Sequence, residues 1–127
     1  MKIAYTFALA LALASPGAKT QAGESCVLPP PDGADVIPSP PSLLGTIEAL
    51  KGNSVSIRIE GLSQPYRVLL NRHTSMFTVY GGGIGLTDLR VGQHAIVWLK
   101  GCAKPGSAVH KAAVFQICSL ASEPCPD

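Results

Sequence analysis

The sequence lacks the spacings from which catalytic and metal sites are usually recognised. Its three histidines, His73, His94 and His110, stand in no metal-ligand spacing with one another or with a cysteine. No Gly-x-Ser-x-Gly motif marks a nucleophile, and the carboxylates of residues 43–118 occur singly. These absences argue against an enzyme and against a metal or other cofactor, although a metal site assembled only by the fold stays open as the alternative.

Recognisable phosphate-binding loops are absent as well. The run Gly81-Gly82-Gly83-Ile84-Gly85 lacks the Gly-Lys-Ser/Thr ending of a P-loop. It also departs from G-x-G-x-x-G, because Leu86 follows it. We therefore expect a flexible loop in which the backbone approaches its surroundings closely.

A long apolar run occurs at the N-terminus. Lys2 precedes the apolar residues 3–14, and Ser15-Pro16-Gly17 ends them. The run is too short to span a bilayer and has the order of a secretory signal peptide, predicted over residues 1–22. We expect a periplasmic or secreted chain with no transmembrane segment after cleavage. The alternative is an uncleaved anchor or a buried N-terminal helix.

Charge is nearly balanced overall but unevenly placed. The chain has ten Lys and Arg residues and eight Asp and Glu residues, a net charge of +2. Residues 43–118 hold eight of these bases and three of the acids, a net charge of +5, whereas the segments on either side are acidic. A basic core attracts an anionic partner, and ordinary solubility charge is the competing interpretation.

Proline is concentrated in residues 23–42, as Pro29-Pro30-Pro31, Pro38 and Pro40-Pro41. Proline fixes φ and donates no backbone hydrogen bond, so we predict an extended strap or linker there. Residues 119–127 are expected to form a polar tail.

Residues 43–118 consist of short runs of β-forming side chains separated by turns. In residues 54–60, Val55, Ile57 and Ile59 alternate with polar side chains, which is a period of two. We expect five strands, over residues 44–50, 54–60, 66–71, 93–100 and 109–118. The longest connection follows the third strand and is expected to hold one short helical turn with Thr87 as its cap.

Five short antiparallel strands, with the longest connection between the third and fourth, are typical of a small oligonucleotide/oligosaccharide-binding (OB) barrel. We therefore predict an all-β fold. It consists of a five-stranded antiparallel OB-like barrel over residues 43–118 with a Pro-rich N-terminal strap.

Turn and core positions of this segment also resemble a known family. They are Gly45-x-Ile47, Val55-x-Ile57, Thr74, Asp88-Leu89-x-Val91-Gly92-x-x-Ala95-x-Val97 and Ala112-x-x-Phe115-x-Ile117. In this pattern the chain resembles a group of exported bacterial domains, small OB-like barrels of unknown function. The resemblance implies the fold and an envelope location, and it implies no catalytic residue. Members of that group are often tandem or lipid-anchored, whereas this chain has one copy and four cysteines.

The four cysteines are expected to form two disulfides, because an exported chain meets an oxidising environment. Strand direction selects among the three pairings. If the first strand runs up, the fourth runs down and brings Cys102 to the end where the strap carrying Cys26 arrives. Cys118 then lies a long hairpin away from Cys102 and close to Cys125. We predict the pairs Cys26–Cys102 and Cys118–Cys125.

The predicted fourth strand is apolar on both faces. Ala95, Val97 and Leu99 fill one face, and Ile96 and Trp98 occupy the other. The second face is either covered by the strap or open as a binding surface that contains Trp98.

Arg58 and Arg67 are expected on the outer face of the second and third strands, the usual ligand-bearing side of OB barrels. Together with Trp98 they form the predicted ligand or partner surface. Ion pairs of the arginines with Glu60 or Glu48 are the plainer alternative.

The function predicted from the sequence is that of an exported, non-catalytic binding or interaction module. It would act on an anionic envelope component or a partner protein, and export argues against nucleic acid as the partner. The alternatives are a structural accessory of a larger envelope assembly and, more distantly, a cell-wall hydrolase.

Overall fold

The computed structural model describes residues 25–106 and 109–126, and the predicted signal peptide lies outside them. Six strands and two short 3-10 turns follow the strap. They are β1 (Leu43–Lys51), β2 (Ser54–Arg58), β3 (Tyr66–Leu69), β4 (Ser75–Thr78), η1 (Leu86–Asp88), β5 (His94–Leu99), η2 (Lys100–Cys102) and β6 (His110–Ile117). Five of the strands lie where the period of two predicts them, and β4 was not predicted.

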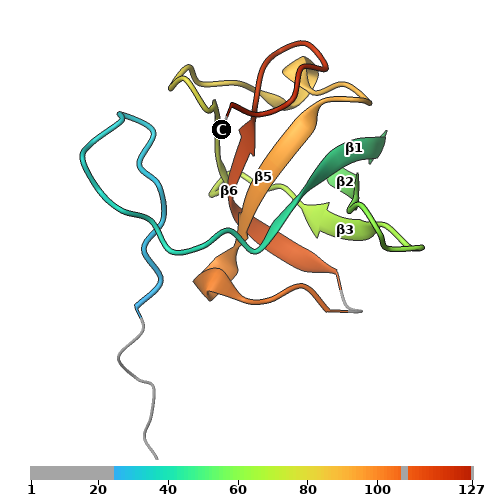
Figure 1. Ribbon diagram of the computed structural model, residues 1–127, viewed down its shortest axis with the longest axis horizontal. Helices are drawn as coiled ribbons and strands as arrows, with labels where there is room; N and C mark the ends of the chain where they lie inside the picture. The colour runs from blue at the N-terminus through green and yellow to red at the C-terminus, as the bar shows by residue number, and fades with distance from the viewer. Residues whose placement is uncertain (1–24, 107–108, 127) are drawn as a thin grey trace, which may run out of the picture.

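The fold is all-β, and five strands close into an OB-like barrel, as predicted (Figure 1). The order is β3, β2, β1, β5, β6, and each of these neighbours is antiparallel. Pairing of β3 with β6 closes the barrel, and this pair is parallel. The sequence predicted only antiparallel pairs. Strand direction cannot alternate all the way around a ring with an odd number of strands, so one pair has to be parallel.

Strand β4 lies inside the glycine-rich connection that we expected to be a loop. It pairs in parallel with the second half of β6, from Ser75 opposite Val114 to Thr78 opposite Ile117. Beyond it the chain folds back, since Thr78 N donates to Gly82 O at 2.8 Å and Phe77 bridges to Gly83. The expected flexible loop is therefore the returning arm of a small hairpin.

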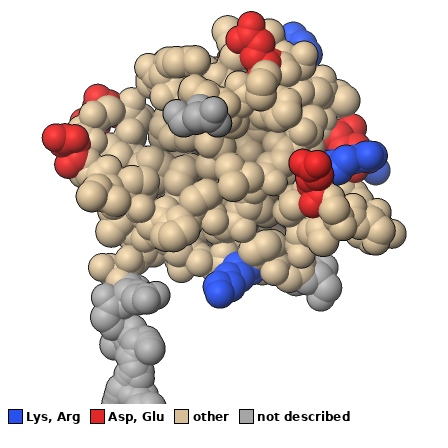
Figure 2. Space-filling model, in the orientation of Figure 1, with Lys and Arg blue, Asp and Glu red and all other residues tan. Residues whose placement is uncertain are grey.

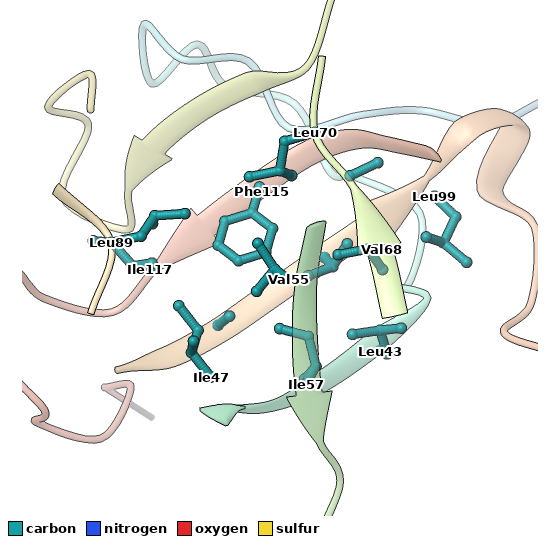
Figure 3. Packing of buried hydrophobic residues seen from close by; sticks show 13 residues of the cluster. Leu43, Ile47, Val55, Ile57, Val68, Leu70, Leu89, Leu99, Phe115 and Ile117 are labelled. Atoms are coloured by element: carbon teal, nitrogen blue, oxygen red, sulfur yellow. The ribbon is translucent and has the colours of Figure 1, made fainter. Parts of the chain in front are cut away.

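The inward-facing side chains form one core around Phe115 (Figure 3). Each barrel strand contributes at least one fully buried side chain, as the alternation in the sequence requires. These include Ile47 of β1, Val55 and Ile57 of β2, Val68 of β3, Val97 and Leu99 of β5, and Phe115 and Ile117 of β6. Burial of such a side chain contributes roughly 1.5–3 kcal/mol, so the core is the main source of stability.

The alternation in β1 is interrupted after Ile47. Ala49 follows the buried Ile47 by two residues, the spacing of one strand face, but it is exposed. The pairing of β1 with β2 shifts between Ile47 and Ala49, and this bulge reverses the faces beyond it.

The strap runs across the outer side of β5 (Figure 1). Ser42 N donates to Val97 O at 2.8 Å, and Ser42 Oγ accepts from Leu99 N at 2.9 Å. Farther back, Ser39 N donates to Val27 O at 2.8 Å, and Val27 N donates to Ser39 Oγ at 2.9 Å. These bonds give a proline-rich segment the fixed course that its own backbone cannot supply.

Both predicted disulfides are present, Cys26–Cys102 and Cys118–Cys125. The first ties the strap to the end of β5, where antiparallel β1 begins. Two disulfides indicate an oxidising, extracellular-type environment.

A buried amide fixes the approach to β5. Gln93 is 1% exposed, and its Oε1 accepts from Arg90 N at 2.8 Å. Its Nε2 donates to Asp88 O and to Leu120 O, each at 3.0 Å. One side chain thus joins η1 to the tail beyond β6, a role that the sequence pattern did not indicate.

Gly45 lies where β1 passes closest to β2. A Cβ atom on this residue would stand 2.3 Å from Arg58 O and 2.6 Å from Ile57 Cγ2. Backbone atoms of a paired strand cannot yield that space without disturbing the ladder, so only glycine fits.

The variant Gly45→Ala should lower the free energy of unfolding by about 1–3 kcal/mol, the usual cost of overpacking a tight site. Gly83→Ala is the matched control, because a Cβ there meets no atom within 4 Å. Urea denaturation of both variants measures the difference, and equal midpoints would contradict the close approach at Gly45.

Candidate functional site

A groove lies between the β2–β3 turn and the described ends of the β5–β6 connection, with a volume of about 620 Å³. It is lined by Ser56, Leu62, Ser63, Gln64, Pro65, Tyr66, Arg67, Gly106 and Val109. We call it the β2–β3 groove. It lies on the side of the barrel that carries ligands in OB folds.

The β2–β3 turn builds one wall of the groove. Leu62 N donates to Ile59 O at 3.1 Å, and Gly61 has a φ of 87°. A positive φ at the third residue of a four-residue turn defines type II and favours glycine there. The turn holds Leu62 at the surface, 50% exposed, as an apolar part of the wall.

Pairing of β2 with β3 sets the direction of Arg67. Arg67 lies opposite Ser56, and Tyr66 lies opposite the buried Ile57. The alternation along β3 therefore sends Arg67 outward, while Tyr66 packs partly against the core. In the described part of the chain no carboxylate lies within 4 Å of the Arg67 guanidinium. The groove thus contains a cation that no carboxylate of the described residues neutralises.

Arg58 lies on the same outer face as Arg67, but its charge has a partner. Its guanidinium forms an ion pair with Glu48 of β1. The sequence had offered Glu60 as the partner of Arg58 and Glu48 as that of Arg67, so the pairing is different. The Arg58 side chain is 66% exposed, and such a surface pair contributes little stability. Arg58 also does not line the groove.

Trp98 does not line this groove, and the structure does not bring it together with Arg67. The residue is 4% exposed and packs with Phe77 and Val114 on the outer side of β5. Its indole Nε1 donates to Ser39 O of the strap at 2.7 Å. In addition, β1 separates β5 from β2 in the sheet. The strap covers Trp98, which was the first of the two interpretations of this strand.

The face shown in Figure 2 carries its charged side chains at the margin. Among the described residues, the middle of that face shows no charged side chain, and the acidic residues stand on both sides of it. This view therefore offers no cluster of cations for an anionic ligand.

The remaining sequence candidates do not converge. Within residues 25–106 and 109–126, no three His, Cys, Asp or Glu side chains are grouped so as to hold a metal ion. His110 Nε2 accepts from Gly106 N at 3.2 Å, and His73 Nε2 accepts from Arg72 Nε at 3.4 Å. Two of the histidines thus accept hydrogen bonds from residues close to them in the sequence.

Sequence reasoning missed most of the groove wall. Leu62 and Gln64 come from the β2–β3 turn, and Val109 directly precedes β6. Nothing in their spacing marks them as neighbours. The turn residues between the second and third strands were the only available signal.

Comparison with known proteins adds no residue roles. No family model, curated protein or solved structure matches this chain. Among the residues that the structure describes, no helix is long and apolar enough to cross a membrane.

The covered position of Trp98 can be measured directly, because it is the only tryptophan of the chain. With both disulfides formed, its emission should be blue-shifted and resistant to acrylamide. Replacing Cys26 and Cys102 with serine should increase quenching, since the strap loses its tether. The free energy of unfolding should fall by up to about 4.5 kcal/mol, the chain-entropy value for so long a loop.

The matched control replaces Cys118 and Cys125 with serine. This change removes the disulfide that closes a short loop, which should lower the free energy of unfolding by up to about 2.5 kcal/mol. It should leave Trp98 quenching unchanged. Quenching of the disulfide-bonded protein at the rate of free indole would show that the strap does not cover Trp98.

Proposed function

We propose that this chain is an exported, non-catalytic binding module whose β2–β3 groove holds an acidic saccharide of the cell envelope. The observation that carries this proposal is Arg67, a cation without an anionic partner in the described chain, at a groove rich in hydrogen-bonding groups. The ligand thus belongs to the anionic envelope components expected from the sequence.

The chemistry of the lining supports a sugar acid. Ser56, Ser63 and Gln64 offer hydroxyl and amide groups that can donate and accept hydrogen bonds. Arg67 offers the planar fork that binds a carboxylate through two hydrogen bonds. Tyr66 adds a half-buried ring with an apolar face. An acidic sugar presents hydroxyl groups and a carboxylate together.

The lining supports binding rather than catalysis. No Asp, Glu, His or Cys stands among the described residues that border the groove. Hydrolysis of a saccharide ordinarily uses a pair of carboxyl groups as acid and base or nucleophile. A cell-wall hydrolase, the distant alternative, therefore finds no support at this site.

An envelope location belongs to the proposal. The N-terminal signal pattern and the two disulfides support a periplasmic or released protein. The resemblance to exported OB-like domains points the same way. A partner protein of the envelope is the other class of ligand for the groove.

A structural accessory role has one observation in its favour. The strap residues between Val27 and Ser39 form a projecting loop whose ends are held together (Figure 1). Ile37 of this loop is 92% exposed. An apolar side chain held out on an anchored loop is suited to contact a neighbouring protein.

The test uses the mature chain with both disulfides, titrated calorimetrically with an oligogalacturonate. The same oligosaccharide with its carboxylates methyl-esterified is the neutral control. The acid form should bind, and Arg67→Ala should weaken binding roughly 10- to 100-fold, as expected for loss of a hydrogen bond to a charged group.

Lys51→Ala removes an equal charge from the end of β1, where Lys51 does not line the groove, and should leave the affinity nearly unchanged. Equal affinity of the Arg67→Ala variant and the unchanged protein would refute the role of the groove. Products released from the oligosaccharide would refute the absence of catalysis.

A further inference from the structure

A second hollow lies farther along the β3–β6 seam, beyond the β2–β3 groove. Its volume is about 310 Å³, and it is lined by Asn71, His73, Lys100, Lys111, Ala112 and Ala113. We call it the lysine hollow. It shares no lining residue with the β2–β3 groove.

The β5–β6 ladder brings the two lysines together. Leu99 pairs with Ala112 in the antiparallel register, so Lys100 and Lys111 follow at the same end of the ladder. Both are exposed and both line the hollow. Like charges on neighbouring strands repel each other and destabilise the pair.

No internal partner relieves this repulsion in the described chain. Across residues 25–106 and 109–126, the carboxylate–cation contacts within 4 Å consist of Arg58 with Glu48 alone. An anion bound between the two ammonium groups would be attracted to both, and these two attractions would outweigh the repulsion between the lysines. The two lysines therefore favour an anionic ligand at this place.

Besides Lys100 and the residues of β6, the hollow is lined by a turn after β3 that is hydrogen-bonded to β6. Thr74 Oγ1 accepts from Asn71 N at 3.0 Å and donates to Ala112 O at 2.7 Å. Asn71 Oδ1 accepts from His73 N at 2.7 Å, which leaves the amide NH₂ of Asn71 for a ligand. Arg72 lies beside His73 and brings another cation to the rim.

The seam connects the hollow with the groove. Leu69 of β3 pairs with Lys111 of β6, and Arg67 precedes Leu69 by two residues on the same outer face. Strand geometry places Arg67 about 7 Å along β3 and about 5 Å across from Lys111. Arg67, Lys111 and Lys100 thus follow one another across β3, β6 and the start of η2.

We propose that the lysine hollow is a second anion-binding subsite, and that one linear acidic polysaccharide runs from the β2–β3 groove across the seam into it. This inference rests on the proposed function of the groove and specifies the ligand as a polymer with regularly spaced carboxylates. Single-stranded nucleic acid has similar charge, but its sites stack successive bases on aromatic rings. Tyr66 is the only Phe, Tyr or Trp residue that lines the two sites in the described chain.

The experiment compares an oligogalacturonate dimer with a hexamer, using the mature disulfide-bonded chain. The hexamer should bind more tightly, and the double variant Lys100→Ala/Lys111→Ala should weaken the hexamer roughly tenfold while leaving the dimer unchanged. The affinity of the double variant should depend less steeply on salt. The magnitude of the slope of log affinity against log salt should decrease by about one to two, because two ammonium contacts are lost. Lys51→Ala tests the loss of one lysine charge outside both sites, and matched melting temperatures of all variants confirm folding.

Inorganic sulfate tests the hollow without the groove. It should shift the backbone amide resonances of residues 99–101 and 110–113 in the unchanged chain but not in the double variant. If the hexamer binds both proteins equally while Arg67→Ala weakens it, the second subsite is refuted and the proposed function stands. If no acidic saccharide binds but sulfate shifts remain, the proposed function fails and the anion site stands. Tighter, lysine-dependent binding of a single-stranded oligonucleotide of equal charge would overturn the choice of a polysaccharide.

Discussion

Strand β5 is apolar on both faces, and both faces have to be covered for the strand to be stable in water. The barrel core covers Ala95, Val97 and Leu99, whereas Phe77 of β4 and the strap cover the side that carries Trp98. The strap has few backbone hydrogen-bond donors because of its prolines. The Cys26–Cys102 disulfide therefore supplements the few hydrogen bonds that hold the strap against the barrel. This covering determines which surface is left for a ligand. With the outer side of β5 occupied, the open side of the barrel is that of β2, β3 and the beginning of β6.

The parts of the fold that follow from local periodicity were predictable. Val55 and Ile57 alternate with polar residues and lie buried in β2, and the same rule placed Arg67 outward on β3. The disulfides were predictable for a different reason. Strand direction decides which end of the barrel each cysteine reaches, and antiparallel pairing of β1 with β5 brings Cys102 to the strap.

The parts that depend on pairing between distant segments were not predictable. Strand β4 has four residues in a glycine-rich connection, and it exists because Ser75–Thr78 meet the free edge of β6. A register shift in β1 exposes Ala49, and no residue type marks that shift. Lys100 and Lys111 are eleven positions apart, so only the β5–β6 register shows that they are neighbours. For the candidate site, therefore, the sequence placed Arg67 on the outer face of its strand, while the groove wall and the lysine pair required the fold.

The closing pair of β3 with β6 affects how the chain can be made. Synthesis delivers a polypeptide from its N-terminus, yet Phe115 at the centre of the core belongs to the last strand. Cys26 is synthesised early, whereas its disulfide partner Cys102 follows 76 residues later in the chain. Until β6 arrives, β3 has an open edge and the inner face of β5 has no complete core. The barrel is thus assembled only when nearly the whole chain is present, as expected for a fold in which non-local contacts dominate. Its early thiol is meanwhile exposed to any oxidant that meets the unfinished chain.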